Sequence, residues 1–274
     1  MRAILAAAIL ALCAVEAPAE AQQTAKVVKI GFVAPQGRSL PLFDAFQKGL
    51  ADLGYVEGKN LVIEPRFAEG DYQRFPQIFA ELVGLKVDLL AVTGAITARA
   101  AKKAAGDIPI VFSIVVDPVA DNVVPSFERP GERITGVTSF DPRQATKQFE
   151  LLKELIPGLK RIAILGDQGV SDALMKASEQ QARALGIQPQ PLRLSGPTPD
   201  LEAAFAVIAY GTSQTEAIRR MAGYIDKILK GAKPSNLPVE AVTRYELFVN
   251  LKTAKQIGIS VPASLLERAN RVLR

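Results

Sequence analysis

The residue types that most enzymes use as nucleophiles, bases and metal ligands are nearly absent from this chain. It contains no histidine and a single cysteine, Cys13, among its 274 residues. A Ser-His-Asp or Cys-His nucleophile therefore cannot be assembled, and neither can a histidine-containing zinc site or a thiolate cage. Carboxylates, lysines and tyrosines could still transfer protons, but no carboxylate pair has a spacing that indicates this role. We expect a protein that is not an enzyme and that holds no cofactor and no metal.

The residues best placed to bind a ligand follow short apolar segments of the chain. Ligands of open α/β sheets bind beyond the carboxyl ends of the strands, where helix N-termini offer unpaired N–H groups. The stretches that follow such segments here are Pro35-Gln36-Gly37, Thr93-Gly94-Ala95 and Ser113 to Asp117. We therefore expect these three stretches to line a binding site.

The elements that must position these stretches alternate between strand and helix from Val27 onward. Apolar segments at 27–33, 61–64, 87–92 and 108–112 predict strands, and helical apolar spacing fills the intervals between them. Strands that are apolar throughout, each followed by a helix, are typical of a parallel sheet covered on both faces. This pattern predicts an α/β lobe, lobe 1, over residues 27–133.

A second lobe with fewer strands is expected after a crossing strand at 134–138. Segments 161–165 and 190–194 predict strands, and a long helix runs from Thr212 to Lys230. We expect lobe 2 and the crossing segments over 134–230, with the long helix covering the lobe 2 sheet. The C-terminal segment 231–274 is expected to return to lobe 1, and its part from Tyr245 to Leu273 to be helical with a break at Pro262.

The N-terminal residues have the layout of a cleavable secretory signal. Arg2 precedes a short apolar run, and Ala19-Glu20-Ala21 offers a cleavage site. We therefore expect a signal peptide over 1–21 and a periplasmic protein that begins at Gln22, with Ala17-Pro18-Ala19 as the second choice of site. Lipidation of Cys13 is an alternative, but the preceding Leu12 is not small. A buried N-terminal helix is a further alternative, which Pro18 disfavours.

Two other features have simple interpretations. The formal net charge is +5, yet the basic residues are scattered along polar helix sides among acidic ones. This pattern favours solvated helix faces over a nucleic-acid surface, so no nucleic acid partner is expected. The stretch from Gly54 to Asn60 is similar to a phosphate-binding loop, but it precedes a strand instead of a helix, which indicates a surface turn.

Several longer stretches carry a family resemblance. They are Gly54–Gly70, Asp117–Val119, Arg129–Gly131, Ile134–Val137, Tyr224–Pro234, Leu237–Glu240 and Phe248–Lys255. Together they resemble the ABC transporter substrate-binding family often described as tryptophan/tyrosine transport components, over nearly the whole expected mature chain. The resemblance implies a two-lobed α/β fold of the type I periplasmic-binding-protein kind. It also implies a monomer that grips a small molecule between its lobes and presents it to an ABC permease in the inner membrane.

The resemblance also implies a ligand site in the cleft between the lobes. An amino acid would place its carboxylate at the N–H groups of Gly94 and Ala95 and its ammonium at Asp117. An Asp before Pro118 is equally a turn residue, so both interpretations of Asp117 stay open. The candidate ligand-binding residues are Gln36, Gly37, Thr93, Gly94, Ala95, Ser113, Asp117, Phe140, Asp167 and Tyr210.

Three departures from the family pattern affect this expectation. Gly94-Ala95-Ile96 stands where the family commonly has Gly-Thr-Pro, and Leu165 to Gln168 stands where an Asn is usual. Roughly 50–60 residues, about two βα units, are missing near 206–210. We therefore expect an incomplete second lobe, with Ile218, Met221 and Ile225 on the long helix partly exposed.

Other classes of function remain as alternatives to an importer subunit. The ligand-sensing domain of a regulatory system has a similar fold, but it would need a DNA-binding or signalling module that the sequence does not contain. A degenerate relative that no longer takes part in transport is a second alternative. An enzyme on an α/β scaffold is a third, since fold does not fix function.

Overall fold

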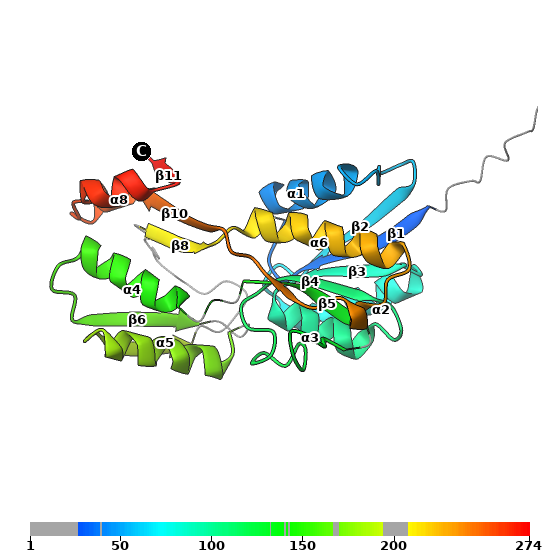
Figure 1. Ribbon diagram of the computed structural model, residues 1–274, viewed down its shortest axis with the longest axis horizontal. Coiled ribbons are helices and arrows are strands. Elements are labelled where there is room, and N and C mark those ends of the chain that lie inside the picture. The colour runs from blue at the N-terminus through cyan, green and yellow to red at the C-terminus, as the bar shows by residue number, and fades with distance from the viewer. Residues whose placement is uncertain are drawn as a thin grey trace, which may run out of the picture.

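A computed structural model of the chain describes residues 27–38, 40–131, 133–139, 141, 143–166, 170–193 and 208–274. These residues form two α/β lobes that lie side by side and are joined by crossing segments (Figure 1). The expected signal peptide 1–21, with Cys13 and the cleavage site, lies outside the described residues. So do Phe140, Asp167 and the part of the expected gap before Ile208. None of the described helices has both the length and the apolar composition needed to cross a bilayer.

Lobe 1 is built on a six-stranded sheet in which all neighbouring strands are parallel. The sheet has the order β2-β1-β3-β4-β5-β9. Its strands are β1 (Val28–Ala34), β2 (Leu61–Phe67), β3 (Leu89–Thr93), β4 (Ile110–Val115), β5 (Ile134–Thr138) and β9 (Glu240–Ala241). Every residue of β3 is buried, as expected for a strand covered on both faces. The predicted parallel sheet is confirmed, but β5, expected as a crossing strand, pairs with β4 inside this sheet.

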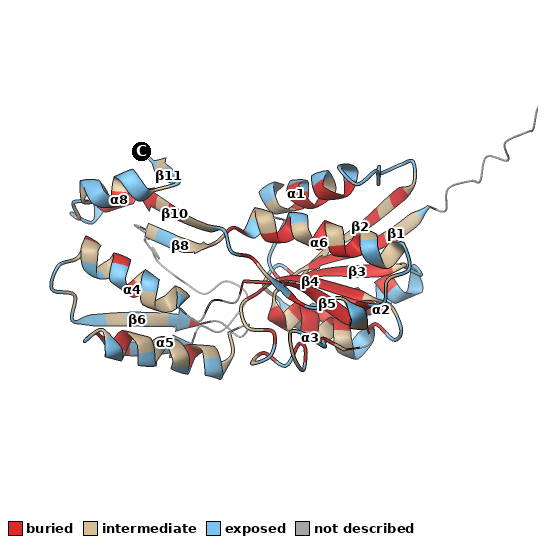
Figure 2. Cartoon of the chain, in the orientation of Figure 1, coloured by how far each residue is buried: buried red, intermediate tan, exposed pale blue. Residues whose placement is uncertain are grey.

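Helices cover both faces of the lobe 1 sheet. On one face lie α1 (Leu40–Ala51) and α6 (Gln214–Leu229), and on the other lie α2 (Phe75–Gly84) and α3 (Ala95–Ala104). Two short 3-10 turns, η1 (Tyr72–Arg74) and η2 (Pro234–Asn236), complete the lobe. Each face has its own hydrophobic core, and the central strands β3, β4 and β5 between them are almost entirely buried (Figure 2). Lobe 1 therefore supplies a rigid support for the loops at its strand ends.

The placement of α6 corrects the expected organisation. The helix was expected on the lobe 2 sheet with Ile218, Met221 and Ile225 partly exposed, yet all three side chains are fully buried. They pack in one core with α1 and with strands of lobe 1. A glycine in α1 allows this close approach, because a Cβ built at Gly49 would lie 3.0 Å from the Cβ of Ala222. The apolar face of α6 is thus satisfied without a complete second lobe.

Lobe 2 contains two separate small sheets. Strands β6 (Arg161–Gly166) and β7 (Gln188–Arg193) form a parallel pair, and β10 (Tyr245–Asn250) lies between β8 (Ile208–Thr212) and β11 (Arg271–Leu273). Four helices complete the lobe: α4 (Gln144–Leu155), α5 (Asp172–Ala184), α7 (Leu251–Gln256) and α8 (Ala263–Arg268). The chain after residue 244 therefore packs in lobe 2 and not in lobe 1, and it is not helical throughout. Leu247 and Val249 are buried at a spacing of two residues, which is the period of a strand.

Among the described residues, helices cover the β6–β7 pair on one side only. Ile162 and Ile164 pack against α4 and α5, whereas Leu165 and its partner Leu192 are 44% and 41% exposed. Figure 2 shows the contrast with the buried sheet of lobe 1. A cavity of about 460 Å³ separates β6 from β8 and is lined mostly by apolar side chains. The described part of lobe 2 thus contains five strands in two small sheets, three more than the two regular strands that the sequence predicts.

Candidate functional site

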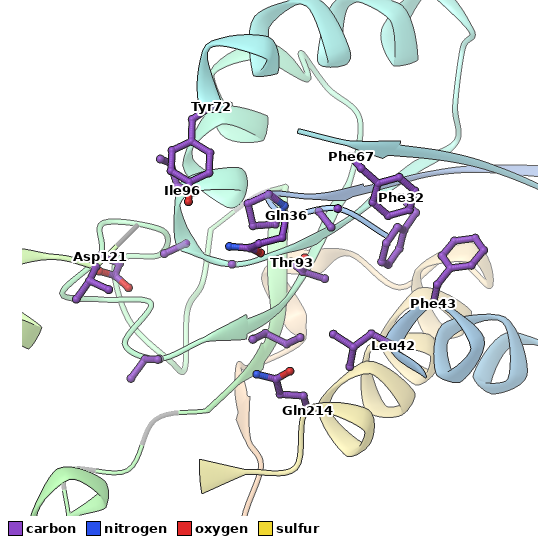
Figure 3. A pocket seen from close by; sticks show the side chains of 18 of the residues that line it. Phe32, Gln36, Leu42, Phe43, Phe67, Tyr72, Thr93, Ile96, Asp121 and Gln214 are labelled. Carbon is purple, nitrogen blue, oxygen red and sulfur yellow. The ribbon is translucent and has the colours of Figure 1, made fainter. Parts of the chain in front are cut away.

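The strand order of lobe 1 creates a crevice between β1 and β3. The helix that follows β1 covers one face of the sheet, and the helix that follows β3 covers the other. The loops at these two carboxyl ends therefore diverge, and ligands of open α/β sheets bind at such switch points. A cavity of about 400 Å³ lies at this point (Figure 3), within the size range of small-molecule sites.

One wall of the cavity is aromatic and apolar. The ring centroids of Phe32 and Phe43 are 5.3 Å apart, and those of Phe43 and Phe67 are 6.3 Å apart. Leu42 and Ile114 extend the same wall. Figure 3 shows the three rings grouped at one end of the cavity, with Asp121 toward the opposite end. The cavity is therefore polarised, with an apolar end suited to a hydrocarbon or aromatic group.

The N-terminus of α3 supplies unpaired donors to the cavity. Gly94, the N-cap residue, has φ 81° and ψ 152° and no side chain with which to cap the helix. This backbone conformation is essentially confined to glycine, and the Gly94 N–H donates to the Ser113 carbonyl at 2.9 Å. The first-turn N–H groups of α3 and the helix dipole favour a negatively charged group at this position.

A bulge in β4 directs another side chain into the site. The register between β4 and β5 shifts between Phe112 and Val115, and Ile114 has φ 56°. A β-branched residue in the left-handed region is a true outlier, and such strain gathers at functional sites. The bulge places Ile114 among the residues that line the cavity. No sequence signal pointed to it, because isoleucine is among the least expected residues in that conformation.

The structure brings together half of the predicted site residues. Gln36, Gly37, Thr93, Gly94 and Ala95 line the cavity. Ser113 lies in β4 and is fully buried, and its hydroxyl has no partner among the described residues.

The other four residues of the prediction either do not line this cavity or lie outside the described residues. The Asp117 Oδ1 atom accepts the N–H groups of Val119 at 3.1 Å and Ala120 at 2.9 Å, so this carboxylate caps its own turn. Tyr210 lies in β8 of lobe 2, beside the other cavity. Phe140 and Asp167 lie outside the described residues.

Asp121 is a site residue that the sequence analysis missed. It lines the cavity, is only 4% exposed, and its Oδ1 atom has no partner among the described residues. Burial raises the pKa of the Asp121 carboxyl above its ordinary value of 3.8, and the Ser171 hydroxyl and the Arg99 charge oppose that rise. Residue type and spacing do not show burial in an irregular loop, so the sequence contained no signal for Asp121.

Lobe 2 and the crossing region contribute the remaining side of the cavity. Val170 lies just before α5 and Leu174 in its first turn, and Gln214 is the first residue of α6. The cavity is therefore lined from both lobes. Among the described residues no group of three or more histidine, cysteine, aspartate or glutamate side chains could hold a metal ion.

Two crossing segments are tied together beside the site. The Tyr245 hydroxyl, at the start of β10, donates to Asp141 Oδ2 at 2.6 Å, in the segment between β5 and α4. Tyr210 stacks on Tyr245 with ring centroids 5.5 Å apart. The hydrogen bond from Tyr245 lowers the pKa of the Asp141 carboxyl. These contacts join the chain segments that cross between the two lobes.

Replacing Tyr245 by phenylalanine should reveal this tie through its pH dependence. A group whose pKa is lowered by folding contributes stability above its unfolded value, and that stability is lost as the pH falls through the folded value. We expect Tyr245→Phe to be about 1 kcal/mol less stable at pH 7. The difference should shrink once the pH drops below the ordinary Asp141 value of 3.8. Thermal melts at several pH values would measure it, with Tyr210→Phe as the control; a pH-independent difference would contradict this role.

Comparisons with known proteins agree with this architecture. The profile of the family described as ABC transporter substrate binding protein matches residues 31–195 and 196–273. The two matched ranges meet between residues 195 and 196 and together cover most of the chain.

Individual proteins are also similar to this chain in sequence or in fold. A tyrosine-binding protein of Clostridioides difficile (strain R20291) is 35% identical over 120 residues, which cover 44% of this chain and 34% of that protein. The match thus spans about a third of the curated relative. A conserved domain protein from Vibrio cholerae has a TM-score of 0.79 and 26% identity, with coverage of 90% of this chain and 100% of that one.

A second solved structure shares the fold at lower identity. The ABC domain in complex with L-Trp from Streptococcus pneumoniae has a TM-score of 0.79 and 22% identity, with coverage of 90% of this chain and 99% of that one. The family profile covers most of the chain, and the observed fold is that of type I periplasmic binding proteins. The chain therefore belongs to the ABC transporter substrate binding protein family.

Proposed function

We propose that this protein is exported to the periplasm and captures an α-amino acid with an aromatic or other apolar side chain. It then presents the closed form to an ABC permease in the inner membrane. The observation that carries this proposal is the cavity of about 400 Å³, lined from both lobes, with an uncapped helix N-terminus and an aromatic wall. Binding between two lobes converts ligand capture into a change of shape that a permease can recognise.

The site geometry supports one orientation of the ligand. A carboxylate beside Ala95 and Ile96 would accept hydrogen bonds from the N–H groups of the first turn of α3, whereas the Gly94 N–H is already used by the Ser113 carbonyl. The side chain would then point to the wall formed by Phe32 and Phe43. The names of two similar proteins are consistent with this choice, since one is a tyrosine-binding protein and the other was solved with L-Trp.

The proposed export of the protein and its delivery of ligand to a permease are supported by observations outside the cavity. The basic start, apolar run and Ala19-Glu20-Ala21 site are typical of a cleavable signal, and periplasmic export fits a subunit of an importer. The permease is proposed from family membership. The proposed protein acts as a monomer without catalytic activity, because capture and release require only binding.

A second candidate function is supported by the exposed β6–β7 sheet. Closure needs two firm lobes, and Leu165 and Leu192 show that one face of this sheet is uncovered. A degenerate relative that has lost transport would tolerate such a lobe. The two candidates differ in ligand affinity, which the importer subunit must retain.

A thermal-shift screen of the mature chain against the common amino acids and small organic acids tests the proposal. A ligand present at 100 times its Kd adds about 2.7 kcal/mol to the stability of the folded state. For a chain of this size that gain corresponds to a rise in Tm of about 5–10 °C. We expect the largest rises with L-tyrosine or L-tryptophan. No rise with any amino acid would contradict the proposed function and favour the degenerate relative.

A further inference from the structure

The cavity in lobe 2 lies where two small hydrophobic cores fail to merge. Helix α4 packs with β8 and β10 through Leu151 and Leu155, and it packs with β6 and α5 through Phe149. The two sheets of the lobe are not joined, and the cavity of about 460 Å³ occupies the space between β6 and β8. Protein interiors rarely leave so large a space, because apolar walls without partners lose their dispersion contacts.

The lining of this cavity is apolar and uncharged. All but three of the described lining residues are apolar, and none of them carries a charge. The three are Gln148, Ser178 and Tyr210. The Gln148 amide is already used, since its Nε2 atom donates to the Tyr210 carbonyl at 2.7 Å. Burial raises the pKa of Tyr210 above its ordinary value of 10.0, so its hydroxyl stays neutral. A charged ligand would lose its hydration here without gaining a charged partner.

The cavity is large enough for a sizeable ligand and accessible to it. An apolar cavity of about 150 Å³ is enough to hold benzene, so about 460 Å³ accommodates a molecule with two or three rings. Leu165 lines the cavity and is 44% exposed, on the face of the β6–β7 pair that no described helix covers. A ligand can therefore enter from this face without the lobe having to unfold.

The lobe 2 cavity shares a wall with the cavity between the lobes. Val170 and Leu174 line both of them. A molecule in the lobe 2 cavity would therefore contact two of the side chains that complete the other site. A ligand that binds only the folded form of a protein stabilises that form, so such a molecule would also stabilise this shared wall.

We infer that the lobe 2 cavity is a second binding site, for a neutral apolar molecule of two or three rings, and that its occupant completes the core of lobe 2. The occupant supplies the apolar contacts that neither small sheet provides, and it holds Val170 and Leu174 in place. This site is separate from the proposed amino acid site, and the inference does not depend on which ligand binds there.

Fluorescence titration with two matched probes tests the inference. N-phenyl-1-naphthylamine is neutral, and its emission increases and shifts to the blue in apolar surroundings. It should bind the purified protein with a Kd on the order of 10–100 μM. 8-Anilinonaphthalene-1-sulfonate has the same rings and an added sulfonate. It should bind at least about tenfold more weakly, because the lining offers no charge to pair with the sulfonate.

Variants that fill the cavity test where the neutral probe binds. Ser178→Leu adds an apolar side chain from α5, and Ala163→Leu adds one from β6, so each should weaken binding of the probe at least about tenfold. Gln180→Leu is the matched control, because Gln180 is exposed on α5 and does not line the cavity. It should change the affinity by no more than about twofold. Melting curves of each variant verify folding.

Trypsin digestion of the wild type provides a second measure of location. If the probe binds only the folded lobe, a concentration equal to its Kd should slow cleavage at Arg161 about twofold. Arg161 is the first residue of β6, one of the strands that line the cavity. Cleavage of a short unstructured peptide in the same mixture shows whether the probe affects trypsin itself.

The outcomes decide the inference independently of the proposed function. Saturable binding that is lost in Ser178→Leu or Ala163→Leu and kept in Gln180→Leu supports it, whether or not an amino acid binds between the lobes. The inference is wrong if the neutral probe does not bind, if both filling variants bind it as the wild type does, or if the sulfonate binds equally well. Should neither filling variant fold, unchanged cleavage at Arg161 in the presence of bound probe would overturn it.

Discussion

Replacing Gly136 by alanine should unfold the protein or come close to doing so. Gly136 lies in β5, and a Cβ built there would lie 2.2 Å from the Phe112 carbonyl oxygen and 2.8 Å from its nitrogen. Both atoms belong to the backbone of β4, just before the bulge at Ile114. A central buried strand cannot move aside, so we expect a loss of about 3 kcal/mol or more out of a typical net stability of about 5–15 kcal/mol. Chemical denaturation would measure the loss.

A second glycine provides the matched control. Gly223 lies within α6, and a Cβ built there meets no atom within 4 Å. Alanine at this helical position should stabilise the protein by about 0.5–1 kcal/mol, because glycine is a poor helix former. If Gly136→Ala is as stable as the wild type, then β4 and β5 do not approach each other as closely as described. The account of how Ile114 enters the cavity would then be wrong.

Limited trypsin digestion should cut lobe 2 long before lobe 1. Arg161 and Arg193 lie on the two strands of the β6–β7 pair, which has one uncovered face and small supporting cores. Cleavage follows local opening, which occurs most often where few apolar side chains are buried. We expect the first fragments to end at these two arginines. Mass spectrometry of a digestion time course would identify them.

The position of α6 makes this prediction specific. Arg219 is also exposed, but its helix packs on lobe 1 with Ile218 and Ala222 fully buried. Arg219 should therefore resist trypsin for much longer than Arg161, even though it follows β8 in sequence. Equal cleavage at Arg219 and Arg161 would show that α6 does not belong to the lobe 1 core. Equal resistance throughout the chain would show that the second lobe is as stable as the first.

The first lobe was largely predictable because its signals are local. A buried parallel strand is apolar over its whole length, so β1, β3 and β4 are recognisable within a few residues. The turn from strand to helix at Thr93 to Ala95 is also recognisable in the sequence. Because ligands of open α/β sheets bind at the carboxyl ends of the strands, this turn predicts part of a ligand site. These local patterns account for the five predicted residues that line the cavity.

The wrong predictions concern which sheet a helix or strand joins. The apolar face of α6 was predicted correctly, yet the spacing of apolar residues does not show which of two sheets a helix will cover. The same limit applies to β5, whose five buried residues fit either a crossing strand or a sheet interior. In β10 the alternation of Leu247 and Val249 is short and is followed directly by a helix, so the segment resembles a longer helix.

The site residues that were missed depend on tertiary structure. Asp117 and Asp121 are four positions apart in the same loop, and composition favours neither of them. The fold buries Asp121 against the start of α5, whereas Asp117 turns back to the N–H groups of its own turn. Ile114 is in the cavity only because β4 bulges. Such features follow from long-range packing, which no pattern in one sequence contains.

The central claim is that the cavity between the lobes holds one aromatic amino acid. Equilibrium dialysis of the mature protein against radiolabelled L-tyrosine and L-tryptophan tests it most directly, because it counts bound ligand without relying on a change in stability. At least one of the two amino acids should be retained at one molecule per chain, and an excess of the unlabelled amino acid should displace it. Retention of neither amino acid, at protein concentrations well above micromolar, would contradict the account.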